Sequence, residues 1–205
     1  MNYHPPIYPN NTYHIFNEAV GNEKIFLCDE DYRQFLIRYF KHILPVAETL
    51  GWTLSPTHFE FLIRTRTNEH IASHYRKMKY LPCGNYDKLP EFIMERFSNW
   101  LNSYTKSFNI KQQRKGGLFA DYLKREIVED GQQIKSKLIE IHTSPLHNGL
   151  CNKLQDWPWS SYSQLLHNSF SHIPDHEIWE IFGSKNNFIH QHQQFAMNGK
   201  MFNAR

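Results

Sequence analysis

The chain has 205 residues, of which 40% are hydrophobic and 15% are aromatic, and only 9 are glycine. This composition excludes a disordered or low-complexity chain and predicts one globular domain with a substantial core and a tail. The formal net charge of +3 is mildly basic, so it permits a nucleic-acid partner without requiring one.

The first half of the chain predicts a strand, a helix and two further strands. Residues 1–11 carry three prolines and are expected to form an irregular lead-in. A strand is expected from Thr12 to Phe16. Apolar side chains then recur at three- and four-residue steps over residues 29–44, which indicates an amphipathic helix. Two runs rich in β-forming residues follow, over residues 51–54 and 59–65.

The second half of the chain predicts mainly helices. Residues 66–90 are polar and contain glycine and proline breakers, so we expect a loop or an insertion there. Apolar spacing predicts a second helix over residues 92–108 and a third that begins near Ile134 and ends at Pro145. The segment 178–197 predicts one or two short helices. This order of elements is compatible with an α+β fold.

The run from Ser55 to Arg64 has the spacing of a two-histidine metal site in which one histidine is missing. On a β-strand, His58 and Glu60 project from one face while Phe59 and Phe61 anchor the other. An imidazole and a carboxylate on one face can hold a divalent cation, and Mg²⁺ and Mn²⁺ accept oxygen ligands. The simpler interpretation is a strand whose polar face meets solvent.

The sequence around this run resembles a known family. Pro56-Thr57-His58-Phe59-Glu60-Phe61 is similar to the Pro-x-His-hydrophobe-His-hydrophobe signature of the HUH nucleases, with glutamate at the second histidine. Further segments resemble the single-tyrosine transposase branch of these enzymes, especially the REP-associated tyrosine transposases. They are residues 13–17, 105–109, 116–119, 141–150 and 156–162. The resemblance runs from about residue 12 to residue 165.

The resemblance implies a fold, a domain division and a partner. The expected fold is α+β, a ferredoxin-like HUH domain over residues 12–165, with a central antiparallel sheet and helices packed on one face. A helical C-terminal tail is expected over residues 166–205. The implied partner is DNA, either single-stranded or in a hairpin of the repeat-palindrome kind. A monomer and a homodimer are both compatible with the sequence.

The resemblance also implies a DNA strand-transfer reaction, but this sequence has other residues at three of the positions that carry the reaction in the family. In the family, paired histidines hold a cation that polarises the scissile phosphate, and a tyrosine attacks that phosphate. Glu60 occupies the second histidine position, Glu140 the tyrosine position, and Ser144 the position of an Asn or Gln metal ligand. A carboxylate is a much poorer nucleophile and would give an acyl phosphate. We therefore expect strand transfer to be impaired or lost, with Mg²⁺ or Mn²⁺ as the metal if one binds.

Two other functions stay open on the sequence. His58 with Glu60 or Glu140, joined by His142, could form a metal cluster that activates water, which would make the protein an active metal-dependent DNA nuclease. The second is a domesticated scaffold with no DNA role. Rescue of the nucleophile by another tyrosine is less expected than packing of each candidate in the core or at its edge. These candidates are Tyr104, Tyr122 and Tyr162.

Basic residues concentrate between residues 106 and 125, where Asp121 is the one acidic residue. The predicted DNA-binding residues are Lys106, Lys111, Arg114, Lys115, Lys124 and Arg125, together with Arg64 and Arg66 at the end of the metal-site strand. Phe108, Phe119 and Tyr122 offer ring faces on which unpaired bases could stack. Taken alone, the segment could be a solvated basic loop, and the resemblance favours DNA contact.

The remaining motifs predict structural roles. His190 and His192 lie in a Gln-rich tail and are expected at the surface, whereas Trp157 and Trp159 are expected to pack the tail onto the core. The three cysteines are far apart and odd in number, so we expect neither a disulfide framework nor a cysteine zinc site. A reducing cytoplasm fits these cysteines best. No leader pattern is expected at the start of the sequence, and no apolar run approaches the length needed to cross a bilayer.

Overall fold

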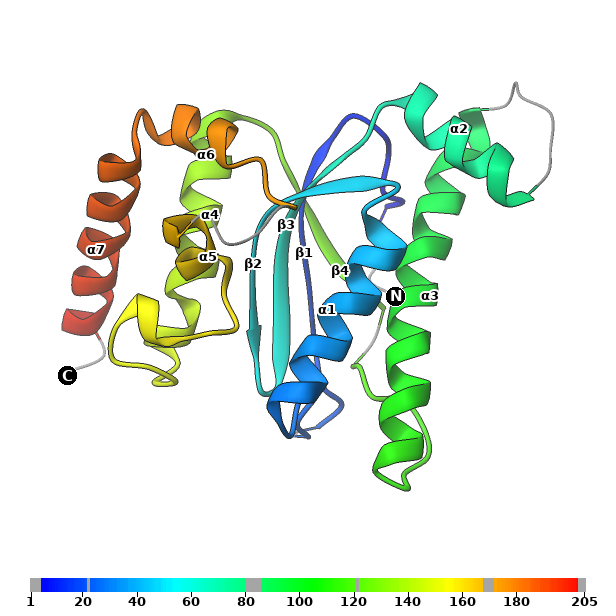
Figure 1. Ribbon diagram of the computed structural model, residues 1–205, viewed down its shortest axis with the longest axis horizontal. Coiled ribbons are helices and arrows are strands. Elements are labelled where there is room, and N and C mark those ends of the chain that lie inside the picture. The colour runs from blue at the N-terminus through cyan, green and yellow to red at the C-terminus, as the bar shows by residue number, and fades with distance from the viewer. Residues whose placement is uncertain (1–4, 22, 80–85, 121, 168–171, 203–205) are drawn as a thin grey trace.

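The computed structural model describes residues 5–21, 23–79, 86–120, 122–167 and 172–202. Its centre is a four-stranded antiparallel sheet (Figure 1). In spatial order the strands are β2 (Ala47–Ser55), β3 (His58–Thr65), β1 (Thr12–Glu18) and β4 (Lys124–Val128). The predicted α+β fold with a central antiparallel sheet is confirmed.

Two long helices, α1 (Asp29–Ile43) and α3 (Leu89–Lys111), cover one face of the sheet (Figure 1). The alternation of side chains along β3 turns Phe59 and Phe61 toward these helices. The Phe59 ring lies 5.2 Å from the Phe35 ring of α1 and 5.1 Å from the Trp100 ring of α3. All of these rings are fully buried, so they form the centre of the hydrophobic core.

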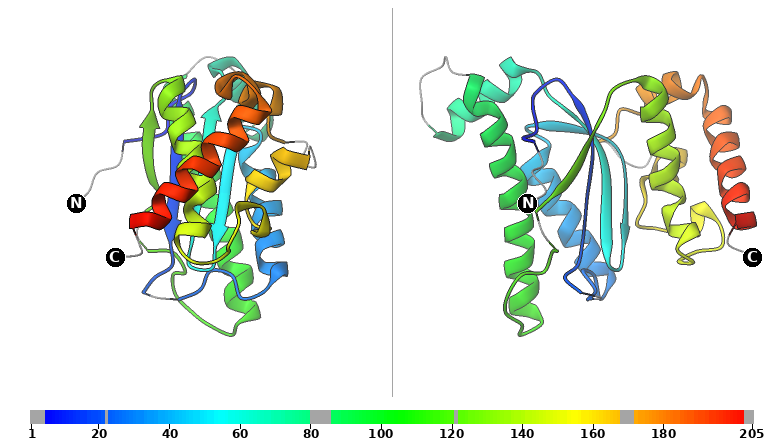
Figure 2. Two further views of the ribbon diagram at one scale, coloured as in Figure 1. Left: turned by 90° about the vertical axis from the view of Figure 1, so that its left-hand side faces the viewer. Right: turned by 180° about the vertical axis from the view of Figure 1, so that it is seen from behind.

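The opposite face is covered by α4 (Gly131–His147), which packs against β2 and β3 (Figures 1 and 2). Gly51 permits this approach, because a Cβ at that position would lie only 2.4 Å from Leu138 Cδ2 of α4. The sheet is therefore covered on both faces, whereas the sequence predicted helices on one face. Periodicity identifies a helix, but the face it covers depends on the path of the chain after β4.

The segment predicted as a loop or insertion over residues 66–90 contains a helix. It comprises α2 (Asn68–Lys79) and a short 3-10 helix, η1 (Tyr86–Lys88). Residues 80–85, which hold most of the predicted breakers, lie outside the described residues. Ile71 is fully buried and α2 contacts α3, so tertiary docking stabilises a helix whose sequence is mainly polar.

Two boundaries also differ from the predictions. Pro145 lies inside α4, whose last residue is His147, and does not end the helix. A proline near a helix end removes one backbone hydrogen bond, and the buried packing of α4 tolerates this loss. The strand β4 arises from the basic segment, where no strand was predicted. Its pairing with β1 sets Lys124 opposite Phe16, a long-range contact that local pattern does not reveal.

The C-terminal part of the chain lies on the α4 side of the sheet (Figure 2). Its elements are the 3-10 helix η2 (Leu154–Asp156), α5 (Ser161–His167), α6 (Asp175–Phe182) and α7 (Lys185–Phe202). With 18 residues, α7 is longer than the short helices predicted. Trp159 stacks on Tyr32 of α1 at 4.6 Å, in line with packing onto the core. Within the described residues, every helix is too short or too polar to span a bilayer.

Candidate nucleic-acid interface

Glu60 is the centre of a polar cluster on the α4 side of the sheet. His14, on the neighbouring strand β1, donates from Nε2 to Glu60 Oε2 at 3.1 Å, and Ser144 of α4 hydrogen-bonds the same carboxylate. His58 Nε2 lies 3.8 Å from Glu60 Oε1. Three residues predicted from the sequence are thus brought together, and His14 is an additional member of the cluster.

The cluster holds Glu60 as a carboxylate and His58 as a neutral imidazole at neutral pH. Burial raises the pKa of Glu60, but hydrogen bonds from His14 and Ser144 and the charge of His14 outweigh burial and hold the pKa below its ordinary value. Burial lowers the pKa of His58, although the charges of Glu60 and Glu18 oppose this shift. The carboxylate of Glu60 is therefore engaged by two donors.

Glu140, which the sequence resemblance placed at the nucleophile position, is exposed on α4 and accepts a hydrogen bond from Lys137 Nζ at 2.7 Å. Lys137 also lies 4.0 Å from the carboxylate of Glu126 on β4, and that carboxylate lies 3.6 Å from His14 Nδ1. A row of close polar contacts through Lys137, Glu126 and His14 therefore links Glu140 to Glu60. The ammonium of Lys137 stabilises the charge of Glu140 and so makes its carboxylate a weaker nucleophile still.

The donors around Glu60 do not form a metal site as arranged. Within the described ranges, no group of three His, Cys, Asp or Glu side chains is placed to hold a metal ion. Glu60 directs its carboxylate to His14 and Ser144, and His142 contributes to a different cluster. The His-carboxylate cluster predicted for a hydrolytic nuclease is therefore not assembled, and no reaction step through a metal follows from this geometry.

A solved structure with a similar fold is described as "Structure of the REP associates tyrosine transposase bound to a REP hairpin". The TM-score is 0.60, and the match covers 85% of this chain and 90% of that chain at 13% sequence identity. The chain shares the fold of that structure. No family model matches the chain, and no curated protein matches it. The likeness establishes the fold alone.

His142 belongs to a buried hydrogen-bond chain between α4, α5 and α7. Its Nδ1 lies 2.9 Å from His192 Nε2, and its Nε2 lies 2.7 Å from Ser161 Oγ. His192 Nδ1 donates to the Phe188 carbonyl at 2.7 Å, so His192 Nε2 accepts from His142 and His142 Nε2 accepts from Ser161. His192 is fully buried and not at the surface as predicted, because this face of α7 docks on α4.

A serine hydroxyl, an imidazole and a further hydrogen-bonding group follow one another here, as in a catalytic triad. In this protein the three side chains hold helices together and do not form a reactive site. All three side chains are buried, with exposed fractions of 1% or less. The backbone N–H of Trp52 donates to Ser161 Oγ at 2.8 Å, so the hydroxyl already ties α5 to β2. A nucleophile needs an open approach for its substrate, which this serine lacks.

The candidate tyrosines and stacking rings fall into two groups. Tyr104 and Tyr162 are buried at 2% exposure, as predicted for core residues. Tyr122 is 85% exposed, so the prediction that it packs in the core or at its edge is wrong. Phe108 is buried and Phe119 packs against the core. Of the three rings predicted to stack on bases, Tyr122 therefore presents the most accessible face.

Most of the predicted DNA-binding cations are paired with carboxylates. The pairs are Arg64–Glu177, Arg66–Glu48, Lys111–Asp31, Arg114–Glu23 and Lys124–Glu18. Arg125 donates to the carbonyls of Pro5 and Leu123. Lys106 and Lys115 are exposed, and no carboxylate in the described part of the chain lies within ion-pair distance of either. These two lysines are the most available for a phosphate, whereas the paired cations must first release their partners.

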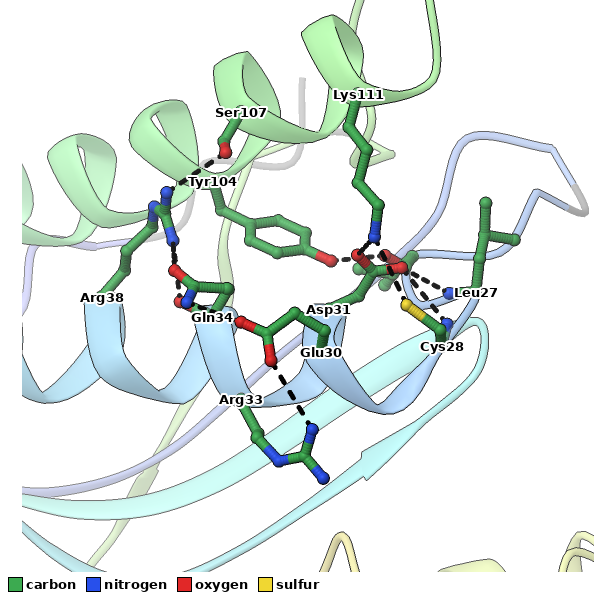
Figure 3. A network of polar contacts seen from close by, with 11 residues as sticks. Leu27, Cys28, Glu30, Asp31, Arg33, Gln34, Arg38, Tyr104, Ser107 and Lys111 are labelled. Atoms are coloured by element: carbon green, nitrogen blue, oxygen red, sulfur yellow. Dashed lines mark hydrogen bonds and ion pairs between the residues drawn. The ribbon is translucent and has the colours of Figure 1, made fainter.

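Lys111 joins α3 to the start of α1 (Figure 3). Its Nζ donates to Asp31 Oδ1 at 2.6 Å and lies 3.3 Å from Cys28 Sγ. Asp31 also accepts the backbone N–H groups of Leu27 and Cys28, which caps the first turn of α1. Burial raises the pKa of Asp31, but the bonds from Lys111 and these backbone groups outweigh it and lower the pKa. Lys111 therefore has a structural task.

The residues that sequence reasoning missed around Glu60 are His14, Glu126 and Lys137. Alternation along Tyr13-His14-Ile15-Phe16 places His14 and Phe16 on one face of a strand, which was the available signal. The partners of His14 depend on the register with the two neighbouring strands, where it lies opposite Glu126 of β4 and two pairs from Glu60 of β3. That register is a tertiary property.

Proposed function

We propose that the protein is a transposase-like DNA-binding protein for single-stranded or hairpin DNA, in which phosphotyrosine strand transfer is impaired or lost. The observation that carries the proposal is the agreement in fold, over 85% of the chain, with a tyrosine transposase described as bound to a REP hairpin. The exposed basic residues Lys106 and Lys115 support a role in phosphate contact.

Loss of the strand-transfer chemistry is supported by the cluster around Glu60. The position of the nucleophile carries Glu140, whose carboxylate is ion-paired with Lys137. The position of the second histidine carries Glu60, whose carboxylate is hydrogen-bonded to His14 and Ser144. Nucleophile and metal ligand are thus both replaced by groups already occupied within the protein. We propose Mg²⁺ or Mn²⁺ only as the cations against which residual activity is to be tested.

Removing the two unpaired lysines is expected to weaken DNA binding. The double change Lys106→Ala, Lys115→Ala removes two cations that have no carboxylate partner among the described residues. We expect lower affinity for a labelled hairpin and for a single strand. We also expect the slope of log association constant against log salt concentration to become shallower by about 1 for each lysine that contacts a phosphate. Fluorescence anisotropy over a range of salt concentrations measures both quantities.

Lys111→Ala is the matched control, because Lys111 lies on the same helix as Lys106 but is bound to Asp31. We expect it to lower the thermal midpoint while the salt slope stays unchanged. If Lys111→Ala changes the slope as much as the double variant, the assignment of free and structural lysines is wrong. If the native protein binds neither DNA at low salt, the scaffold function replaces this proposal.

Incubation with labelled hairpin DNA and Mn²⁺ or Mg²⁺ is expected to give no covalent protein–DNA adduct. A tyrosine at the nucleophile position forms a phosphotyrosine bond to DNA that survives denaturing electrophoresis. The carboxylate of a glutamate does not form such a stable bond. The double change Glu60→His, Glu140→Tyr is expected to produce a detectable adduct, with Glu140→Phe as the control that restores the ring without the hydroxyl. A covalent adduct with the native protein would contradict the proposal that strand transfer is lost. Cleavage of the DNA without an adduct would instead support the function of a hydrolytic nuclease.

A further inference from the structure

Phe16 is a large aromatic residue that the hydrophobic core does not use. It lies on β1, on the sheet face that carries His14, and is opposite Glu60 of β3 and Lys124 of β4. The residue is partly exposed. Among the described residues, it belongs neither to the buried core nor to the partly buried hydrophobics that pack against that core. Packing alone therefore does not account for an aromatic ring at this position.

The ring of Phe16 is held in place from one side. It stacks on the imidazole of His14 with a centroid distance of 4.7 Å and an interplanar angle of 17°. His14 is itself fixed by its hydrogen bond to Glu60. The ring therefore has a defined orientation beside the Glu60 cluster, and ordering it further on binding costs little side-chain entropy.

The edge of this sheet face next to Phe16 is exposed in part. The helix α4 packs against β2 and β3, and the left-hand view of Figure 2 shows β4 beside α4 and not behind it. The side chains of Glu18 and Glu126, which border Phe16, are 57% and 58% exposed. A planar ligand can thus approach the ring from the side of Glu18 and Glu126 once the flexible side chain of Lys124, which lies over the ring, moves away.

We infer that Phe16 is a stacking platform for one unpaired base of a DNA strand. The inference rests on the proposed DNA-binding function and adds the place and the chemical class of the ligand. Aromatic rings bind unpaired bases through their π-faces whatever the base, and sheet-borne aromatics serve single-strand binding in this way. Lys124 Nζ lies over the Phe16 ring, 6.0 Å from its centroid, so a base that stacks on this ring displaces the ammonium group.

The surrounding charges favour a base over a phosphate as the group that binds here. Lys124 is paired with Glu18 at 2.6 Å, and Lys137 contacts both Glu126 and Glu140. Because these charges largely cancel, the subsite attracts the phosphate backbone weakly, and stacking supplies the binding. Loss of Phe16 should therefore reduce affinity without altering the dependence of affinity on salt, in contrast to loss of Lys106 and Lys115.

The test uses Phe16→Leu and Phe16→Trp with single-stranded oligonucleotides in which one base at a time is replaced by an abasic site. We expect Phe16→Leu to bind the intact strand about tenfold more weakly and Phe16→Trp to bind it as tightly as the native protein. At one position, an abasic site should weaken the native protein by the same factor and leave Phe16→Leu unaffected. This non-additivity identifies the base that touches the ring.

Ile127→Ala is the matched control, because Ile127 is an exposed apolar residue, 53% exposed, on the other face of the same sheet. It is expected to bind all oligonucleotides as the native protein does, and thermal midpoints show whether each variant is folded. Equal binding by Phe16→Leu, or additive losses at every abasic position, overturns the stacking site while the DNA-binding function stands. Absence of DNA binding by the native protein overturns both.

Discussion

The free energy of unfolding is expected to fall by about 3 kcal/mol between pH 7 and pH 4 through His192 alone. Burial lowers the pKa of His192 from 6.5 to about 4. Burial and the neighbouring His192 also lower the pKa of His142 well below its ordinary value. Both rings are fully buried in the hydrogen-bond chain that joins α7, α4 and α5, so neither can be solvated when it takes up a proton.

The direction of this effect follows from the two protonation states. Below pH 6.5 the unfolded chain binds protons that the folded protein excludes, so acid favours unfolding. The loss continues until the pH approaches 4, where the folded His192 also becomes protonated. Above pH 6.5 both states are neutral, and the pair contributes no pH dependence. Protonation would also set two N–H donors against each other in the 2.9 Å contact of His142 with His192.

Denaturant unfolding at pH 7, 6 and 5 measures this slope. His192→Gln removes one buried titrating group, so we expect the slope between pH 6 and pH 5 to fall by up to about 1.4 kcal/mol per pH unit. His176→Gln is the control, because the side chain of His176 is 87% exposed, and its slope should match the native protein. A native slope that persists unchanged in His192→Gln contradicts the assignment.

Gly51→Val is expected to destabilise the protein by about 2–3 kcal/mol. A Cβ at Gly51 would lie 2.4 Å from Leu138 Cδ2, 3.3 Å from His142 Nε2 and 3.5 Å from Ser161 Oγ. Leu138 is fully buried and has no room to move into solvent, so α4 must shift away from β2. Valine is itself favourable in a strand, so the loss reports packing and not strand propensity.

Thermal and denaturant unfolding measure the effect, and a second substitution identifies its cause. Gly51→Val combined with Leu138→Ala is expected to be more stable than the sum of the two single losses, because the alanine makes room for the new side chain. Gly117→Ala is the control, since a Cβ there meets no atom closer than 3.9 Å. If the two losses in the free energy of unfolding simply add, Leu138 of α4 is not the side chain that limits the space at Gly51.

Part of the fold could be read from local pattern. The alternation around His58 and Glu60 predicts β3, and the apolar spacing over residues 29–44 predicts α1, because both periods are properties of neighbouring residues. Helix α2 was not predicted, because its sequence is mainly polar and its stability comes from packing its few apolar side chains against α3. Strand β4 (Lys124–Val128) was not predicted, because its sequence is mainly charged and it becomes a strand by pairing with β1.

The candidate site divides in the same way. Motif spacing placed His58, Glu60 and Ser144, and the structure brings these residues into one cluster. Spacing could not reveal His14, whose contact with Glu60 depends on strand register. It also could not reveal which cations are free, because Glu23 and Asp31 lie far in sequence from the basic residues they neutralise.

The sequence by itself thus determined the α+β class and the β3 strand that carries His58 and Glu60, because residue identity and short periods carry that information. Only the tertiary structure decided that Lys106 and Lys115 stay unpaired among the described residues while Lys111 is bound, and that Phe16 lies outside the core and is partly exposed. The physical reason is that ion pairing, burial and solvent access depend on distances between segments remote in the chain.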